Sequence, residues 1–308
     1  MQCRTLTTIA ALAAFTWPSV AEDNPPKTYV DAFEAAVAAP SDPTAGAGLM
    51  ALLPKVTTSF GPPRELFVIE GDLTVDADDL ERYRLAKSVG GISADKQNPE
   101  LIVHVEDGQQ AHWKSGKQTL RYAVVKSTFP DPESYQAVVD DMKNAGGDWV
   151  GACAGCAVAF EYRPQFDALG TWDEFQALAD TDDLRFIVVF NPDASGPIAS
   201  AFFPTDTWQE RLVSIFPKYF TLAPGGYTGR GVLRHELGHV LGYRHEHTRN
   251  IAGCVFEDAN WAPVTPYDPH SVMHYFCGDA GTRELDLSEL DRTGHAANYA
   301  PETPAAVE

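Results

Sequence analysis

The chain has 308 residues, of which 44% are hydrophobic and 11% aromatic, enough to bury the core of one or two globular domains. Its 43 acidic residues outnumber 23 lysines and arginines, which gives a formal net charge of −20 at pH 7. This excess argues against nucleic acid or an anionic membrane surface as a partner, because both repel negative charge. Solubility is the plainer explanation of the same acidity.

The first 21 residues predict a signal peptide. Arg4 precedes an apolar stretch without acidic residues, and Ser19-Val20-Ala21 ends it with small residues at the cleavage positions. The stretch is shorter than the roughly 20 apolar residues that span a bilayer, so a retained anchor is the weaker alternative. We therefore expect a secreted protein, extracellular or periplasmic, without membrane contact once the signal is removed.

Removal of the signal also removes Cys3 and leaves four cysteines in an oxidising compartment. Four cysteines allow three pairings, of which the local one, Cys153 with Cys156 and Cys254 with Cys277, is favoured. The Cys-x-x-Cys spacing is also found in redox and zinc motifs. Against both stands the absence of a second Cys-x-x-Cys from the sequence.

Residues 22 to about 60 are rich in Ala, Pro, Asp and Gly, and their prolines predict a loosely ordered leader. Residues 66–69 then read Leu-Phe-Val-Ile and predict a strand. An acidic stretch from Asp76 to Glu81 is expected to open a short helix.

From Leu120 onward strands and helices alternate. Residues 120–125 have the composition of a strand, and a helix is expected to begin at Asp131 and Pro132, a capping residue followed by proline, and to end at Gly146-Gly147. Further strands are predicted over residues 157–162, 184–190 and 198–203. A second helix follows them.

That second helix carries His-Glu-Leu-Gly-His over residues 235–239. His235 and His239 are four residues apart, so on a helix both imidazoles lie on one face and can reach a single ion. On a straight helix His245 would lie about 9 Å further along the axis, too far for a third bond. Gly242 stands where the chain must turn to bring His245 back, since glycine enters the left-handed region without steric cost.

Three imidazoles leave a fourth position of a zinc ion open, as a catalytic site requires. Glu236, next to the first histidine, is then placed to act as general base toward a water at that position. Leu233, Leu237, Val240 and Leu241 form the apolar face of the helix. Incidental histidines on an ordinary helix are the competing explanation, but chance produces five specified positions in eleven very rarely.

His-Glu-x-x-His-x-x-Gly-x-x-His is the motif of the metzincin metalloproteases, which also have a methionine turn below the metal. Residues 271–275, Ser-Val-Met-His-Tyr, resemble that turn and place Met273 in it. These residues are similar to the turn of the astacin family, in which the tyrosine after the methionine stabilises the tetrahedral intermediate. Tyr275 matches that tyrosine.

Three further places resemble the astacin family: Glu246 after the third histidine, Trp113-Lys114-Ser115-Gly116, and the stretch from Leu287 to Tyr299. It implies an α+β, zincin-like, two-lobed catalytic domain over residues 112–308, with a mixed twisted sheet, a long active-site helix and a C-terminal helix. Residues 22–111 would form a pro-region ahead of it. The lower edge strand would be residues 198–203, able to pair with an extended polypeptide.

Residues 69–72, Ile-Glu-Gly-Asp, resemble the Phe-x-Gly-Asp element of astacin pro-segments. In that family the aspartate takes the open zinc position and keeps the enzyme latent. The resemblance implies that Asp72 is that ligand. Gly-Asp is also an ordinary turn dipeptide. The chain departs from animal astacins in having no cysteine over residues 222–227, just before the zinc helix.

The sequence thus predicts a secreted metalloendopeptidase with one catalytic Zn²⁺, made as a precursor and acting on polypeptides. The ligands are His235, His239 and His245, the general base is Glu236 and the oxyanion stabiliser is Tyr275. A catalytically inactive zinc-binding or adhesive protein with the same fold is the alternative. Hydrolysis of peptide cross-links in a cell wall is a third hypothesis.

Overall fold

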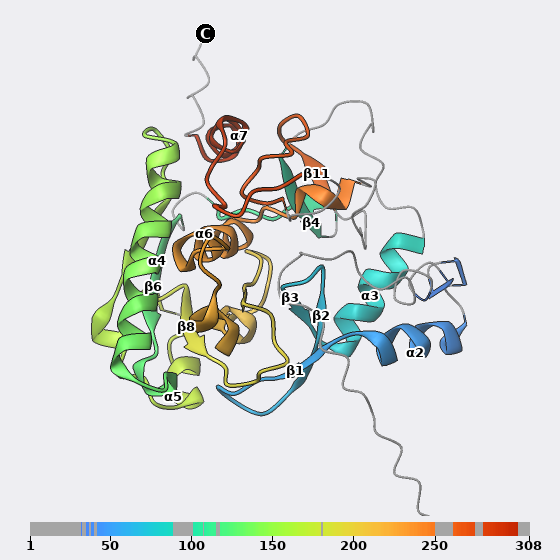
Figure 1. Ribbon diagram of the computed structural model, residues 1–308, viewed down its shortest axis with the longest axis horizontal. Helices are drawn as coiled ribbons and strands as arrows, with labels where there is room; N and C mark the ends of the chain where they lie inside the picture. Colours follow the sequence, from blue (N-terminus) through green and yellow to red (C-terminus); the bar gives the residue numbers. More distant parts are fainter. Residues whose placement is uncertain are drawn as a thin grey trace, which may run out of the picture.

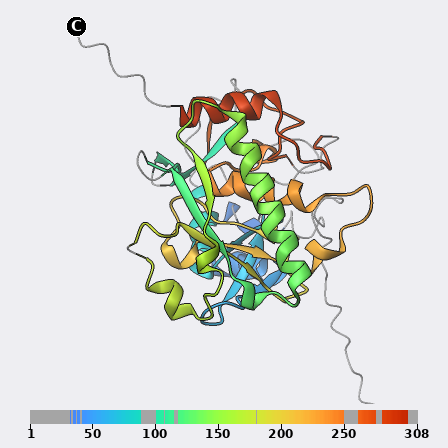
Figure 2. The same cartoon turned by 90° about the vertical axis from the view of Figure 1, so that its left-hand side faces the viewer.

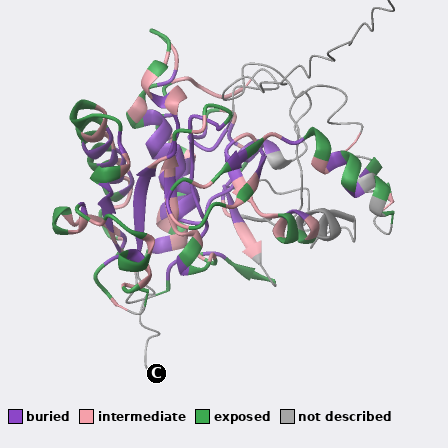
Figure 3. Ribbon diagram, turned by 90° about the horizontal axis from the view of Figure 1, so that it is seen from below, coloured by how far each residue is buried: buried purple, intermediate pink, exposed green. Residues whose placement is uncertain are grey.

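The computed structural model describes residues 42–88, 101–106, 108–114, 118–179, 181–249, 261–274 and 280–300, together with a few alanines between 32 and 39. The predicted signal peptide, Cys254, Tyr275 and Cys277 lie outside the described residues. Among the described helices, none combines the length and the apolar character needed to cross a membrane. In Figure 3 the buried stretches run through the centre of the molecule and the outer helices carry exposed residues.

A five-stranded mixed sheet forms the centre, in the order β7-β6-β8-β10-β9. Its strands are β6 (Thr119–Val124), β7 (Ala159–Tyr162), β8 (Phe186–Phe190), β9 (Ala199–Ser200) and β10 (Leu212–Ile215). Strands β7, β6, β8 and β10 run parallel to one another, and β9 runs antiparallel to β10 at the edge. This confirms the mixed sheet and its edge strand. The edge strand is shorter than predicted, because the chain turns at Phe203, whose N–H donates to Asp206.

Helix α4 (Pro132–Ala152) packs against both the sheet and helix α6 (Gly229–Val240), as Figure 2 shows for the face that α4 covers. Its start is as predicted, with Asp131 accepting the Ser134 N–H at 2.7 Å. The predicted end at Gly146-Gly147 is wrong. A β-carbon at Gly146 would lie 2.9 Å from Cβ of Phe160, so this glycine serves close packing, and Trp149 continues the buried face.

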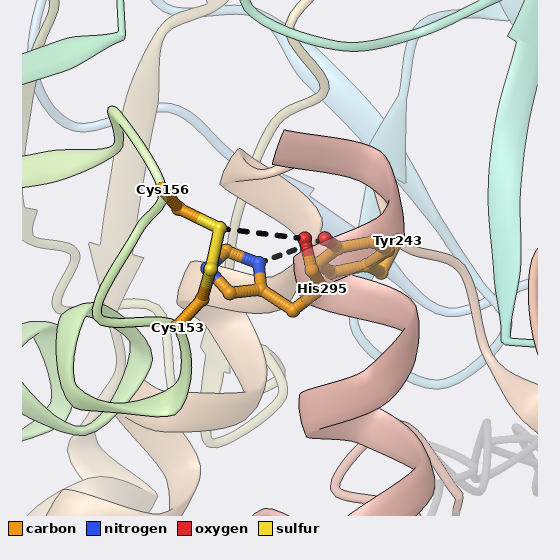
Figure 4. The surroundings of a disulfide bond; sticks show 4 residues. All are labelled: Cys153, Cys156, Tyr243 and His295. Carbon is orange, nitrogen blue, oxygen red and sulfur yellow. Dashed lines mark hydrogen bonds between the residues drawn. A yellow bond between two sulfur atoms is a disulfide. The ribbon is translucent and has the colours of Figure 1, made fainter. Parts of the chain in front are cut away.

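A disulfide between Cys153 and Cys156 directly follows α4 and confirms that pairing. Figure 4 shows it beside His295, which belongs to the C-terminal helix α7 (Glu289–Tyr299). Nδ1 of His295 lies 2.9 Å from the Tyr243 hydroxyl. The bridge therefore lies where α4, α7 and the chain after α6 meet. The predicted partner pair, Cys254 and Cys277, lies outside the described residues.

Residues 42–60 form regular structure, so the loosely ordered leader predicted over residues 22 to about 60 is wrong for this part; most of residues 22–41 lie outside the described residues. Helix α2 (Pro43–Leu52) begins with proline at its first position, where no N–H is needed, and Asp42 caps it. A three-stranded antiparallel sheet, β1 (Lys55–Thr57), β2 (Glu65–Ile69) and β3 (Leu73–Val75), follows. Helix α3 (Ala77–Ser88) follows it, as the acidic stretch predicted.

These elements, blue to cyan in Figure 1, have a small core of their own and contact the rest of the molecule at several places. Phe203 is the one residue of the central part that joins that core, which consists of Ala36, Leu49, Leu53, Phe67, Ile69, Leu73 and Leu80 among the described residues. Phe60 instead belongs to an apolar cluster of the central part. Thr57 donates its N–H to Asp193 at 3.0 Å and accepts from the Asn191 side chain at 2.9 Å. We call residues 43–88 the N-terminal segment.

A third sheet lies beside the chain that follows helix α6. Strand β4 (Ile102–Glu106) pairs with β11 (Trp261–Pro263) and with β5 (Gln109–Gln110). The His104 N–H donates to the Gly242 carbonyl at 2.8 Å, and the Arg244 N–H donates to Ile102 at 2.9 Å. Leu101 and Val103 belong to the main core. The predicted boundary at residues 111 and 112 stays a prediction, and this packing favours an earlier one.

Candidate metal centre

Helix α6 presents the first two histidines. Thr228 caps it by accepting the Gly231 N–H at 3.0 Å, and the predicted apolar face is buried. Its last carbonyls are bonded as well: Val240 accepts from the Trp113 indole at 2.7 Å and Leu241 from the Tyr299 hydroxyl at 2.7 Å. These bonds fix the end of the helix, and so the position of His239.

Gly242 turns the chain as predicted. Its φ is +96°, and a β-carbon there would lie 1.9 Å from the carbonyl oxygen of Ala111, so both conformation and space require glycine. The Tyr243 N–H donates back to the Gly238 carbonyl at 2.9 Å. This bond closes the helix and carries His245 under the other two histidines.

The three imidazoles converge. Nε2 of His245 lies 3.1 Å from Nε2 of His235 and 3.1 Å from Nε2 of His239, and all three side chains are buried. Ligands of a tetrahedral zinc with bonds of about 2.0–2.1 Å are about 3.3 Å apart. The donor set therefore fits a zinc ion, and together with Asp72 it forms a cluster able to hold a metal.

Asp72 occupies the fourth corner. Its Oδ2 lies 3.1 Å from Nε2 of His235, and its Oδ1 lies 3.2 Å from Nε2 of His245 and 3.7 Å from Nε2 of His239. Burial opposes its charge, but its close contacts with the three histidines lower the pKa of Asp72 well below its usual value. The turn between β2 and β3 thus places an ionised carboxylate against the histidines.

Burial lowers the pKa of both His239 and His245 to about 4. The imidazoles are therefore neutral near pH 7, which is the form that binds metal. Burial and the charge of Asp72 raise the pKa of Glu236 well above its usual value. Among the described residues no hydrogen-bond partner is found for Oε2 of Glu236, although that atom is buried.

Met273 lies below the helix as the predicted methionine turn requires. A β-carbon at Gly238 would lie 2.3 Å from its sulfur, so the glycine makes room for it. Its carbonyl accepts the Glu246 N–H at 2.9 Å, which ties the turn to the residue after His245. Helix α7 supports the turn, because its Asp291 accepts from the Ser271 hydroxyl at 2.6 Å and from the Val272 N–H at 2.8 Å.

Each imidazole also has an acceptor for its second nitrogen. Nδ1 of His235 lies 2.7 Å from the Val272 carbonyl, and Nδ1 of His239 lies 2.8 Å from the Tyr243 carbonyl. For His245 the acceptor is Oε2 of Glu70 at 2.8 Å, and Arg244 forms an ion pair with the other oxygen of the same carboxylate.

Sequence reasoning gave no role to Glu70 or Arg244. A signal was present, since an arginine between Gly242 and His245 in a buried motif requires an acidic partner. The predicted oxyanion stabiliser, Tyr275, lies outside the described residues.

A cavity of about 770 Å³ opens beside this cluster. The N-terminal segment forms one wall with Leu66, Ile69 and Leu73. The chain from Ser200 to Phe203 forms the opposite wall, and Arg244 lines the cavity too. The cavity thus lies between the edge strand and the N-terminal segment, and Arg244 is the residue of its lining that directly precedes a histidine of the cluster.

Comparison with known proteins gives short matches. No protein-family model matches the chain. Zinc metalloproteinase nas-3 of Caenorhabditis elegans is 35% identical over 72 residues, covering 20% of this chain and 25% of that protein. High choriolytic enzyme 2 of Oryzias latipes is 33% identical over 72 residues, covering 18% and 25%. The matches thus span about a quarter of the length of these relatives.

Among solved structures, that of myroilysin has a TM-score of 0.41 and 15% identity, covering 66% of this chain and 100% of that one. High choriolytic enzyme 1, described as a hatching enzyme zinc-protease, has a TM-score of 0.36 and 16% identity, covering 60% and 92%. Over the matched stretch, the sequence matches confirm the resemblance predicted from the motif, which is to astacin-like metzincins.

Proposed function

We propose that this protein is a zinc-dependent metalloendopeptidase that is made in a latent form. The observation that carries the proposal is the convergence of three buried imidazoles, with Nε2 of His245 3.1 Å from Nε2 of each of the other two, beside a buried glutamate for whose Oε2 no hydrogen-bond partner is found among the described residues. The sequence matches to zinc metalloproteinases support it. We take His235, His239 and His245 as the ligands.

When bound there, one Zn²⁺ supplies a Lewis acid that makes water a better nucleophile near neutral pH. Glu236 would accept the proton of that water and pass it to the leaving amine, and its raised pKa suits both transfers. Tyr275 would stabilise the negative charge on the carbonyl oxygen. Its position outside the described residues leaves that role resting on the family resemblance.

The N-terminal segment would hold the enzyme latent. Asp72 fills the corner that water needs, and the segment lies across the cavity from residues 200–203 of the edge strand and the chain after it. A polypeptide substrate would pair with the outer edge of β9 once the segment moves away, because β9 is the last strand of its sheet. We place the protein outside the cytoplasm on the signal-peptide prediction, which intact-mass analysis and N-terminal sequencing of the exported protein would test.

The decisive experiment compares wild type with Glu236→Gln on an unstructured protein such as casein, after the N-terminal segment has been removed. Loss of a general base costs roughly 10²–10⁴-fold in rate, whereas zinc content should stay the same, because Glu236 is not a ligand. Equal activity in the two proteins would overturn the mechanism. Full zinc content in wild type without cleavage of any peptide in a broad library would favour the inactive zinc-binding alternative.

A further inference from the structure

The acceptors on the second nitrogens of the three histidines come from different parts of the chain. His235 and His239 use the carbonyls of Val272 and Tyr243, which belong to the central part of the molecule. His245 uses the carboxylate of Glu70, which is 175 residues away and belongs to the N-terminal segment. A piece of the metal centre is therefore supplied by the segment that covers it.

The contact with Glu70 is built for a defined geometry. Its carboxylate is fully buried and lies between the His245 imidazole and the Arg244 guanidinium, each of which contacts a different oxygen. Glu70 also has a φ of +49°, a conformation that few residues other than glycine adopt, and the next residue, Gly71, has a φ of +95°. The turn thus adopts an unfavourable backbone in which Glu70 and Asp72 both face the histidines.

We infer that Glu70 is a positioning residue for the third metal ligand, so that zinc binding and docking of the N-terminal segment stabilise each other. The inference rests on the proposed zinc site and adds a second carboxylate to it. Asp72 contacts the ligand nitrogens directly, whereas Glu70 acts through His245. It accepts the Nδ1 hydrogen and thereby fixes the ring with Nε2 toward the other two histidines.

The expected size follows from other metal sites, where losing the partner of a ligating histidine lowers metal affinity by about 10–100-fold. Coupling between two binding events is reciprocal, so zinc should hold the N-terminal segment in place by the same factor. A protein without the segment should therefore bind zinc more weakly than the intact chain.

The test measures zinc affinity of the full-length protein by competition with a chromogenic chelator. Glu70→Gln keeps the size of the side chain, and we expect it to lower the affinity about tenfold or more. Glu65→Gln is the matched control, because Glu65 begins strand β2, which Glu70 directly follows, and forms an exposed ion pair with Lys55. An affinity for Glu70→Gln within twofold of wild type would overturn the inference.

Two further measurements separate positioning from a general loosening of the segment. In an Asp72→Asn background, Glu70→Gln should still lower zinc affinity; no further loss there would mean that Glu70 only docks Asp72, and the inference would be wrong. The visible absorption of bound Co²⁺ should also change in Glu70→Gln, since it reports ligand geometry. If wild type binds no zinc at all, the proposed function itself fails, which is a different outcome from unchanged affinity in the variant.

Discussion

Gly242 is the residue on which the geometry of the metal centre depends most directly. Its positive φ and the contact that a β-carbon would make with Ala111 both exclude a side chain. Gly147, in the exposed face of α4, has neither restriction, and nothing lies within 4 Å of a β-carbon placed there. The two glycines therefore provide a matched pair.

We expect Gly242→Ala to destabilise the protein by about 3 kcal/mol or more and to lower its zinc content, because the turn that carries His245 must shift. Gly147→Ala should be neutral or stabilising by about 0.5–1 kcal/mol, since alanine is favoured over glycine inside a helix. Chemical denaturation and metal analysis of both variants test this. Equal unfolding free energies would contradict it.

At this scale the sequence predicted much of the site, since spacing and glycine chemistry are local. His235, His239, Gly242 and Met273 lie where the motif places them. Glu70 could not be predicted in the same way, because its partner is 175 residues away and long-range pairing leaves no spacing to recognise.

At the scale of elements, helix α7 supports the metal centre through Asp291. This buried carboxyl accepts hydrogen bonds from the methionine turn, whose Val272 carbonyl accepts in turn from His235. Burial raises the pKa of Asp291 to about 6, although the hydrogen bonds from Ser271, Val272 and Ser288 lower it. In the unfolded chain an aspartate ionises near pH 3.9.

Because the folded pKa is the higher one, the folded state binds this proton more tightly between about pH 4 and 6, and the contribution to stability is lost as pH rises through 6. Asp291→Asn removes the titration. We therefore expect the unfolding free energy of the variant to improve relative to wild type, by about 2 kcal/mol, between pH 4.5 and 7.5. Denaturation of the metal-free proteins tests this, with the exposed Glu289→Gln as control; a pH-independent difference would contradict it.

Phe203 joins the N-terminal segment to the central part. Its ring stacks on His104 with centroids 4.3 Å apart and belongs to the small core with Ile69 and Leu73. Phe203→Ala should weaken docking of the segment by about 3 kcal/mol. Faster hydrogen exchange in β2 and β3 would show it, while Phe220→Ala, at the edge of the main core, should leave that exchange unchanged.

Elements with a strong local pattern were predicted to within a few residues, as β6 and α6 illustrate. The predictions failed where packing decides the outcome: α4 continues through Gly146 because Trp149 is buried beyond it, and α2 forms because Leu49 and Leu53 join a core with distant strands. Strand β10 was not predicted, and its partners are fixed by long-range pairing with β8 and β9.

At the scale of the whole molecule, β4 decides where a stable catalytic unit can start. It bonds to the chain on both sides of Tyr243 and pairs with β11. A chain that starts at Leu101 should keep cooperative unfolding and zinc binding, whereas one that starts at His112 should lose both. Calorimetry and metal analysis of the two truncated proteins test this, and a stable chain starting at His112 would show that β4 is dispensable.

The N-terminal segment contacts the rest of the molecule at several places, among them the metal centre and the loop around Asn191 and Asp193. Linked contacts hold far better than any one of them alone, because a contact that opens stays at a high effective concentration while the others hold. Cutting the chain after the segment would therefore not free the cavity at once. Scission and activation should be separate events, and a lag between the cut and the first turnover would measure how long the severed segment stays in place.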